Sequence, residues 1–383
     1  MKLIVDRATF GNRLKLAMSA VKARTPVPQL QCVHGVAKRR SLEIRATDGE
    51  VGVRIPCDGV DVIEDGEFLV NADRLSSIVG VDGSQTVKIE SDGERIRVSG
   101  KSSKFSVSAY NPADFPWNDG YEKIAKSKDV SAKFTCAAAD LSLAIDRTVF
   151  CANEGTFKNF ATGGVYLNVL DGSVDVVATN GTSMGRDRLT AQCEKSGSAF
   201  VPIKAANMLA KIADYATALA GDESVNVMAE VVVTPTRIGV RVGDIEVVSA
   251  LVEGTFVPYD RILRQESPIA VQIGRLPLID SLRAASVMIS DPMSLSRCVR
   301  FAFSTEGLKL SNRAPETGET YVECPISVYS GESIEVGLDP RPILEALTKL
   351  DSMDVKLELS GNLPVILNAG AYLYLQSTMN IPE

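Results

Sequence analysis

Residues 174–189 read VDVVATNGTSMGRDRL, and similar stretches recur along the chain. Apolar and polar residues alternate on both sides of the Asn-Gly dipeptide at 180–181, which favours a tight hairpin turn. The stretch therefore predicts two antiparallel strands. Similar strand pairs are predicted at 42–57 and at 308–324.

Each predicted hairpin lies between two segments with apolar residues at helical spacing. The first helix of each set is predicted over 7–24, 137–152 and 275–289. The second is predicted over 71–80, 202–215 and 339–350. Further alternating strands follow each second helix, so the order helix, strands, helix, strands occurs three times.

The length of the chain agrees with this repeat. Three units of roughly 128 residues account for 383 residues, and each has a typical domain size. The fold class is therefore α+β, with domains predicted at 1–122, 129–254 and 255–383. Three unrelated α+β domains are the alternative, and they would need this spacing to arise by chance.

Composition excludes several classes of protein. Forty-five per cent of the residues are hydrophobic, which excludes a disordered tail. Lys and Arg number 41 against 48 Asp and Glu, and the net charge of −7 argues against a protein that simply coats DNA. The sequence has neither an apolar run long enough for a membrane span nor a signal-peptide pattern, so we expect a cytoplasmic protein.

Catalytic and metal-binding patterns are weak. The seven cysteines are widely spaced without a C-x-x-C pair, and His34 is the only histidine, so no metal or cofactor is predicted. Residues 181–185 match G-x-S-x-G, the nucleophile elbow of α/β-hydrolases. That motif needs a following helix and a downstream histidine, whereas here a returning strand is predicted. We therefore assign no catalytic residue and expect a protein that is not an enzyme.

Four segments, in order, carry a resemblance to a known family. They are KFSVSAYNPADFP at 104–116, VDVVATNGTSMGRDRL at 174–189, AFVPIKAANML at 199–209 and SALVEGTFVPYDRIL at 249–263. With them the chain resembles the bacterial DNA polymerase III beta subunit, the DNA sliding clamp, over essentially its whole length. The resemblance implies a head-to-tail homodimeric ring around duplex DNA, with helices lining the inside and sheets on the outside. It also implies a role as processivity factor in DNA replication.

A ring that slides on DNA needs positive charge on its inner wall without base readout. On the predicted helix 7–24, Arg13 and Arg24 are spaced to lie on nearly the same face. The resemblance points most directly to Arg24 and Lys204. The full set of candidates for sequence-independent binding of double-stranded DNA is Arg24, Lys22, Arg13, Arg74, Lys158 and Lys204.

The resemblance further implies a hydrophobic cleft between the second and third domains for short peptides, typically of Gln-Leu-x-Leu-Phe type. Such peptides would come from the DNA polymerase III alpha subunit, the clamp loader, translesion polymerases and repair proteins. The matching positions are Thr179, Gly181, Thr182, Ser183, Met184, Val257, Arg261, Ile262, Ser377 and Met379. Many family members have His-Arg in place of Thr182-Ser183 and Pro in place of Val257, which leaves the preferred peptide open. Plain packing between domains is the alternative for each position.

Ring closure is the last expectation from the resemblance. Phe105 and Val107 match one side of the family's dimer interface, and Leu276 and Leu278 lie near the other. Packing within domain cores is the alternative for these four residues. The alternative function is a peptide-binding scaffold with the clamp fold that does not encircle DNA. The basic residues of the inner wall distinguish the two functions, because only a clamp needs them.

Overall fold

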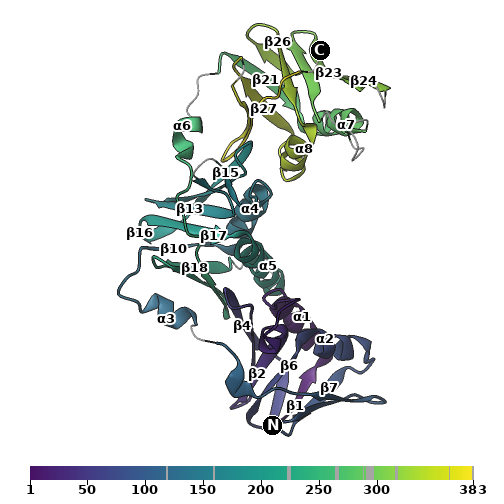
Figure 1. Cartoon of the computed structure of the whole chain (residues 1–383), viewed down its shortest axis with the longest axis vertical. Helices are drawn as coiled ribbons and strands as arrows, with labels where there is room; N and C mark the ends of the chain where they lie inside the picture. Colours follow the sequence, from purple (N-terminus) through teal and green to yellow (C-terminus); the bar gives the residue numbers. More distant parts are fainter. Residues whose placement is uncertain are drawn as a thin grey trace. The chain divides into compact units, whose positions relative to one another are not determined.

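The computed structural model describes residues 1–117, 120–157, 160–221, 226–263, 267–287, 289, 297–314, 318–361 and 363–381. The chain forms two compact units, and each contains antiparallel sheets covered by helices (Figure 1). The first unit consists of Met1–Ser142 with Ala191–Leu251, and the second of Leu143–Thr190 with Val252–Glu383.

The first unit contains a small sheet with strand order β5-β1-β7-β8-β9. Its strands are β1 (Lys2–Asp6), β5 (Val60–Glu64), β7 (Thr86–Ser91), β8 (Arg95–Ser99) and β9 (Lys104–Ser108). β9 pairs with β8 alone, so its other side is a free edge of the sheet among the described residues.

A larger sheet of the first unit has the order β16-β10-β18-β19-β20-β4-β3-β2-β6. Its strands are β2 (Cys32–Lys38), β3 (Ser41–Thr47), β4 (Val51–Cys57), β6 (Gly66–Asn71), β10 (Ala132–Ala137), β16 (Gln192–Lys195), β18 (Met228–Val233), β19 (Arg237–Val242) and β20 (Ile245–Ala250). The pairing of β4 with β20 joins the early and late segments of this unit. The first unit also contains the strand β17 (Gly197–Pro202).

In the second unit the strands of the large sheet run in the order β13-β14-β15-β29-β28-β27-β21-β25. They are β13 (Gly164–Leu170), β14 (Ser173–Thr179), β15 (Ser183–Thr190), β21 (Ile269–Gly274), β25 (Val328–Ser330), β27 (Asp354–Leu359), β28 (Val365–Ala369) and β29 (Tyr372–Gln376). A smaller sheet, β24-β23-β22-β26, comprises Gly318–Cys324, Gly307–Ala314, Val299–Ser304 and Ile334–Leu338. β11 (Thr156–Phe157) pairs with β12 (Phe160–Ala161).

The helices of the first unit are α1 (Arg7–Met18), α2 (Ala72–Val81), α3 (Tyr121–Ala125) and α5 (Ile203–Ala220). Those of the second are α6 (Tyr259–Leu263), α7 (Arg275–Ser286) and α8 (Pro340–Thr348), and α4 (Ala138–Val149) contains the point of division. Short 3₁₀ turns occur at η1 (Pro28–Gln31) and η2 (Pro112–Asp114). α1 lies beside α2, and α7 beside α8 (Figure 1).

Several helices begin directly after a strand, at a residue that caps them. The side chains of Asp6, Asn71 and Asp339 accept hydrogen bonds from backbone N–H groups in the first turns of α1, α2 and α8. Such caps satisfy donors that have no partner inside the helix. The strand-to-helix step is therefore encoded locally, which explains why the repeat is visible in the sequence.

The predicted hairpins are confirmed. The segment 174–189 forms β14 and β15, paired from Ser173 with Thr190 to Thr179 with Met184. The segment 42–57 forms β3 and β4, and 308–324 forms β23 and β24. The α+β fold class is confirmed as well, since helices and strands follow one another in three similar sets along the chain.

The helix predicted over 7–24 is wrong beyond Met18. The next residues close tight turns, in which the N–H groups of Ser19 and Ala20 donate to the carbonyls of Leu16 and Ala17. The Ser19 hydroxyl also donates to the Leu16 carbonyl, a local bond that competes with helix continuation. The chain then turns away from the helix axis.

Candidate functional site

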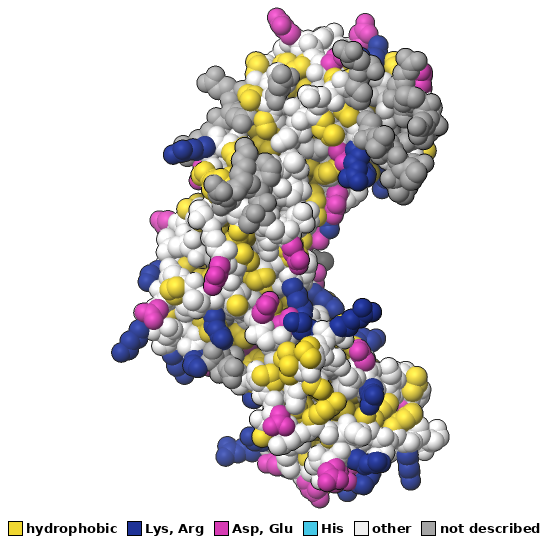
Figure 2. Space-filling model, in the orientation of Figure 1, with side chains coloured by type: hydrophobic (Ala, Val, Ile, Leu, Met, Phe, Trp, Pro, Cys, Tyr) yellow, Lys and Arg dark blue, Asp and Glu magenta, His cyan; other side chains and the backbone are white. Residues whose placement is uncertain are grey.

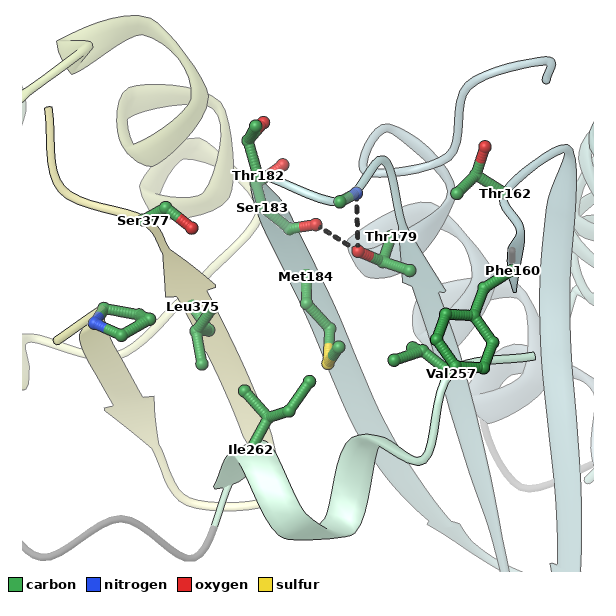
Figure 3. A pocket seen from close by; sticks show the side chains of 12 residues that line it. Phe160, Thr162, Thr179, Thr182, Ser183, Met184, Val257, Ile262, Leu375 and Ser377 are labelled. Atoms are coloured by element: carbon green, nitrogen blue, oxygen red, sulfur yellow. Dashed lines mark hydrogen bonds between the residues drawn. The ribbon is translucent and has the colours of Figure 1, made fainter. Parts of the chain in front are cut away.

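A pocket of about 190 Å³ lies in the second unit, beside the turn between β14 and β15 (Figure 3). Apolar side chains form most of its lining. The pocket is lined by Phe160, Thr162, Thr179, Gly181, Thr182, Ser183, Met184, Val257, Ile262, Pro364, Leu375 and Ser377. We call it the cleft.

The rim of the cleft is a turn fixed by its own hydrogen bonds. The Thr179 hydroxyl donates to the Ser183 carbonyl at 2.7 Å and accepts from the Gly181 N–H at 3.0 Å (Figure 3). The Asn180 side-chain oxygen accepts from the N–H groups of Thr182 and Ser183. Gly181 has a φ of 90°, which only glycine adopts without strain. The turn is therefore rigid before any ligand arrives.

The floor of the cleft comes from two strands that are distant in sequence. Met184 on β15 lies opposite Leu375 on β29, and both side chains are buried. Ile262 and Val257 approach the same space from the segment that follows the central part of the chain (Figure 3). Leucine- and aromatic-sized groups of a peptide would find a preformed apolar surface here.

The wall that carries Val257 and Ile262 is anchored by aromatic residues. The ring of Phe256 stacks on Tyr166 with centroids 4.7 Å apart. The Tyr259 hydroxyl donates to Asp175 at 3.0 Å and accepts from the Asn168 amide at 2.9 Å. Burial raises the pKa of Tyr259, so the phenol stays protonated and keeps both bonds.

The carboxylate that holds Tyr259 is itself fully engaged. Asp175 is 1% exposed and accepts two hydrogen bonds from the Arg188 guanidinium, at 2.6 and 2.9 Å. A buried carboxylate with a bidentate arginine and a phenol has its charge and its lone pairs satisfied. The strands β14 and β15 thus provide a fixed support for α6.

All predicted cleft residues except Arg261 and Met379 line the pocket. Arg261 is exposed on α6, and the N–H of Met379 donates to the carbonyl of Gly337 on β26. Four further lining residues were not predicted from the sequence: Phe160, Thr162, Pro364 and Leu375. Leu375 could have been predicted, because it lies in the alternating segment 372–376, directly before the predicted cleft residue Ser377.

The G-x-S-x-G match has a structural explanation in both glycines. Gly181 occupies the turn, and a Cβ on Gly185 would lie 3.3 Å from the Thr148 Cα and the Cys151 Sγ, so glycine permits α4 to approach β15. The Ser183 hydroxyl donates to Asn180, and a strand follows it rather than a helix. His34 lies on β2 of the first unit and bonds to Glu67. This arrangement has no nucleophile elbow.

The predicted DNA-binding residues differ in their surroundings. Lys22, Arg24 and Arg74 are exposed and form no salt bridge with an acidic side chain that the structure describes. The ammonium of Lys204 lies 2.5 Å from Asp48, and its side chain is 43% exposed. Lys and Arg side chains gather over the region of α1 and α5 (Figure 2). Lys158 lies outside the described residues.

Arg13 departs from the expectation of an exposed DNA contact. It lies on the buried face of α1 with Phe10 and Leu14, and its side chain is only 4% exposed. The guanidinium donates to Asp58 at 2.9 Å and lies over the Tyr215 ring, 5.4 Å from the centroid. Its position on the helix therefore makes Arg13 a packing residue in this structure.

The predicted dimer residues separate into two kinds. Phe105 and Val107 are half-buried on β9, at the free edge of the small sheet. Leu276 is 61% exposed at the start of α7. Leu278 is wholly buried with Ile279 on the core face of that helix, so its expected place at an interface is wrong. Two residues along a helix point to nearly opposite sides, which explains the difference.

No helix within the described part of the chain is long and apolar enough to cross a membrane.

Helices and antiparallel strands that recur in three similar sets along the chain define a clamp-type fold. Family models of the DNA polymerase III beta subunit match in chain order: its N-terminal domain at residues 1–119, its central domain at 135–258 and its C-terminal domain at 260–378. The chain belongs to the DNA polymerase III beta subunit family, the bacterial sliding clamps, whose members are non-catalytic processivity factors.

Individual relatives are similar to this chain over nearly its whole length. The beta sliding clamp of Chlamydia pneumoniae is 24% identical over 388 residues, covering 100% of both chains. That of Pseudomonas aeruginosa is 25% identical over 367 residues, covering 94% of each. The crystal structure of the Thermotoga maritima DNA polymerase III beta subunit matches with a TM-score of 0.87 at 19% identity, covering both chains completely. The structural likeness shows the clamp fold.

Proposed function

We propose that two copies of this chain close head to tail into a ring that holds duplex DNA and keeps a replicative polymerase on it. The observation that carries the proposal is the free edge at β9. A strand edge presents unpaired N–H and C=O groups that invite another strand. Phe105 and Val107 provide the apolar contact that pairing would bury.

The complementary edge is β24 in the second unit. β24 pairs with β23 alone among the described strands, and Tyr321 on it is 63% exposed. Leu276, near the start of α7, is a second exposed apolar residue of the same unit. A β9–β24 contact between copies is heterologous, and it closes after two copies if the rotation between them permits.

The basic residues support sequence-independent contact with the DNA backbone. Lys22, Arg24 and Arg74 have no acidic partner among the described residues, so phosphates would not compete with a salt bridge. Lys204 would exchange Asp48 for a phosphate. Because the net charge is −7, general attraction is weak, and retention on DNA would depend mainly on enclosure. Such a protein acts in the bacterial cytoplasm.

We infer that the cleft binds short linear motifs of partner proteins. These would include the DNA polymerase III alpha subunit, the clamp loader, translesion polymerases and repair proteins. The apolar floor at Met184 and Leu375 suits leucine and phenylalanine anchors, and the N–H and hydroxyl groups of the Thr179–Ser183 turn suit polar ends of the motif.

A primed-circle synthesis assay with the cognate polymerase and clamp loader tests the function. We expect much longer products when the chain is present, and retention on nicked circular DNA that disappears once the circle is cut. Equal retention on linear and circular DNA would contradict enclosure. A scaffold with the clamp fold would leave product length unchanged.

A further inference from the structure

The first unit contains a second pocket, and it copies the cleft in its backbone. This first-unit pocket has a volume of about 60 Å³ and lies beside the turn between β3 and β4. It is lined by Thr47, Gly49, Glu50, Gly52, Pro116, Trp117, Arg237, Val248, Ser249 and Ala250.

Four hydrogen bonds are common to the two turns. The Thr47 hydroxyl donates to the Val51 carbonyl at 2.9 Å and accepts from the Gly49 N–H at 3.0 Å, as Thr179 does with its own turn. Asp48 takes the place of Asn180 and accepts from the Val51 N–H at 2.8 Å. The turn that forms the rim of the cleft therefore occurs a second time in the same chain, between β3 and β4.

The neighbouring strands agree in register. In the first unit Gly52 on β4 lies opposite Val248 on β20, and in the second unit Met184 lies opposite Leu375. A backbone hydrogen bond next to each turn also matches. The Ala250 N–H donates to the Glu50 carbonyl, and the Ser377 N–H donates to the Thr182 carbonyl. Gly52 thus holds the position that Met184 holds on the floor of the cleft.

Gly52 has no side chain to match that of Met184, and the ring of Trp117 fills the space instead. A Cβ on Gly52 would lie 2.8 Å from the Cζ3 atom of Trp117, so the indole occupies the space above this glycine. The ring also stacks with Phe115 and lies under the Arg45 guanidinium, 5.7 Å from its centroid. Only about 60 Å³ remains open, compared with about 190 Å³ in the cleft.

We propose that the first-unit pocket is a second peptide cleft that Trp117 fills as an internal ligand. Trp117 supplies the large aromatic group that a partner peptide would otherwise insert, and its linkage to the same chain gives it a high effective concentration. Among the described residues, the repeat therefore builds this rim twice and leaves one of the two pockets open. The inference rests on the peptide-binding role proposed for the cleft.

The experiment counts peptides bound per chain. The probe is an acetylated Gln-Leu-Ser-Leu-Phe peptide, and the readout is stoichiometry by isothermal titration calorimetry on the full chain. We expect one peptide per wild-type chain. We expect two for the Trp117→Ala variant, or for Trp117→Ala combined with Gly52→Met, which restores the methionine found at the matching position of the cleft.

The wild-type chain offers an independent readout, because Trp117 is its only tryptophan. We expect its emission spectrum to stay constant while the cleft fills, since the peptide does not displace the internal ligand. A shift of that emission in step with the first binding event would overturn the proposal.

The remaining outcomes are also decisive. One peptide per chain in both folded variants would overturn the inference and leave the cleft intact. Loss of the fold in both, seen by circular dichroism, would overturn it too, because Trp117 would then be an essential core residue. No binding to any chain would count against the cleft itself, and the inference would fall with it.

Discussion

The hydroxyl of Tyr259 joins three elements of the second unit. It donates to Asp175 on β14 and accepts from Asn168 on β13, while the residue itself begins α6. Val257 and Ile262, on either side of it in sequence, line the cleft. One phenol therefore determines where the apolar wall of the cleft stands relative to the floor.

Replacing Tyr259 by phenylalanine tests this role. The change removes both hydrogen bonds and leaves the buried Asp175 carboxylate and the half-buried Asn168 amide each short of one partner, so we expect the free energy of unfolding to fall by about 1–3 kcal/mol. Peptide affinity should fall with it. Chemical denaturation and calorimetry measure the two effects. Tyr110→Phe, at a position that is 39% exposed, is the matched control, and an equal loss there would refute the role of the phenol.

His34 gives the protein a pH dependence near neutrality. Burial lowers the pKa of His34 below its usual 6.5, and this outweighs the opposing effect of the 3.1 Å hydrogen bond with Glu67. The ring also packs against Phe115. Below about pH 6.5 the unfolded chain therefore binds a proton more readily than the folded chain does.

We expect the free energy of unfolding to decrease as pH falls from about 7.5 to about 5.5, the range around the ordinary pKa of histidine. Because His34 is the only histidine, a His34→Gln variant should show a flatter profile over this range. Denaturant titrations at several pH values measure it. The lowered pKa of Glu67 affects stability only at pH values below its usual 4.5, outside this range. An unchanged pH dependence in the His34→Gln variant would show that another group causes it.

Single residues also show what the sequence could not predict. The candidates around the β14–β15 turn lie together along one pocket, because a tight turn and strand alternation fix their positions locally. Arg13 and Leu278 were misplaced, since the buried face of a helix depends on the sheet beneath it. Phe160 and Pro364 were missed because the cleft brings together segments that are distant in the sequence.

Among the helices and strands, hairpins and helix starts were predictable and helix ends were less so. Asn180-Gly181 indicates the turn between β14 and β15, and the helix starts predicted at 71, 202 and 275 agree to within one residue with those of α2, α5 and α7. The end of α1 depends on the hydroxyl of Ser19 and on tertiary contacts that no periodicity reveals.

The free edge of β9 leads to a prediction about assembly. A Val107→Arg substitution places a charge where strand pairing would bury an apolar side chain, so we expect the dimer to dissociate. Multi-angle light scattering should give the mass of a single chain, 41.0 kDa, in place of twice that value. Met353→Arg, at a position 91% exposed, is the control. A stable dimer of Val107→Arg would place the interface elsewhere.

For binding to DNA, the distribution of charge on the protein matters more than the net charge. α3 and α5 lie on opposite sides of the β18–β20 strands (Figure 1). The exposed Lys22 and Arg24 follow α1, whereas Lys126 ends α3 and pairs with Glu122. A protein of net charge −7 can therefore still present a basic surface to DNA on one side.

Reversing Lys22 and Arg24 to glutamate tests that surface. We expect shorter products in primed-circle synthesis and a salt dependence of DNA binding that weakens by about 0.9 in logarithmic slope for each phosphate that the variant no longer neutralises. Lys126→Glu changes charge on the other side of the sheet and should leave both unchanged. Equal effects of the two changes would indicate a general charge effect.

The pairing of β15 with β29 has a thermodynamic consequence for partner binding. Met184 and Leu375 face each other across that pairing, so a peptide in the cleft can bind only while the two strands remain joined. Any ligand that requires this pairing stabilises it, by about 2.7 kcal/mol at a concentration roughly one hundred times its dissociation constant. A docked polymerase would thus make the clamp harder to unfold at the place where it is held.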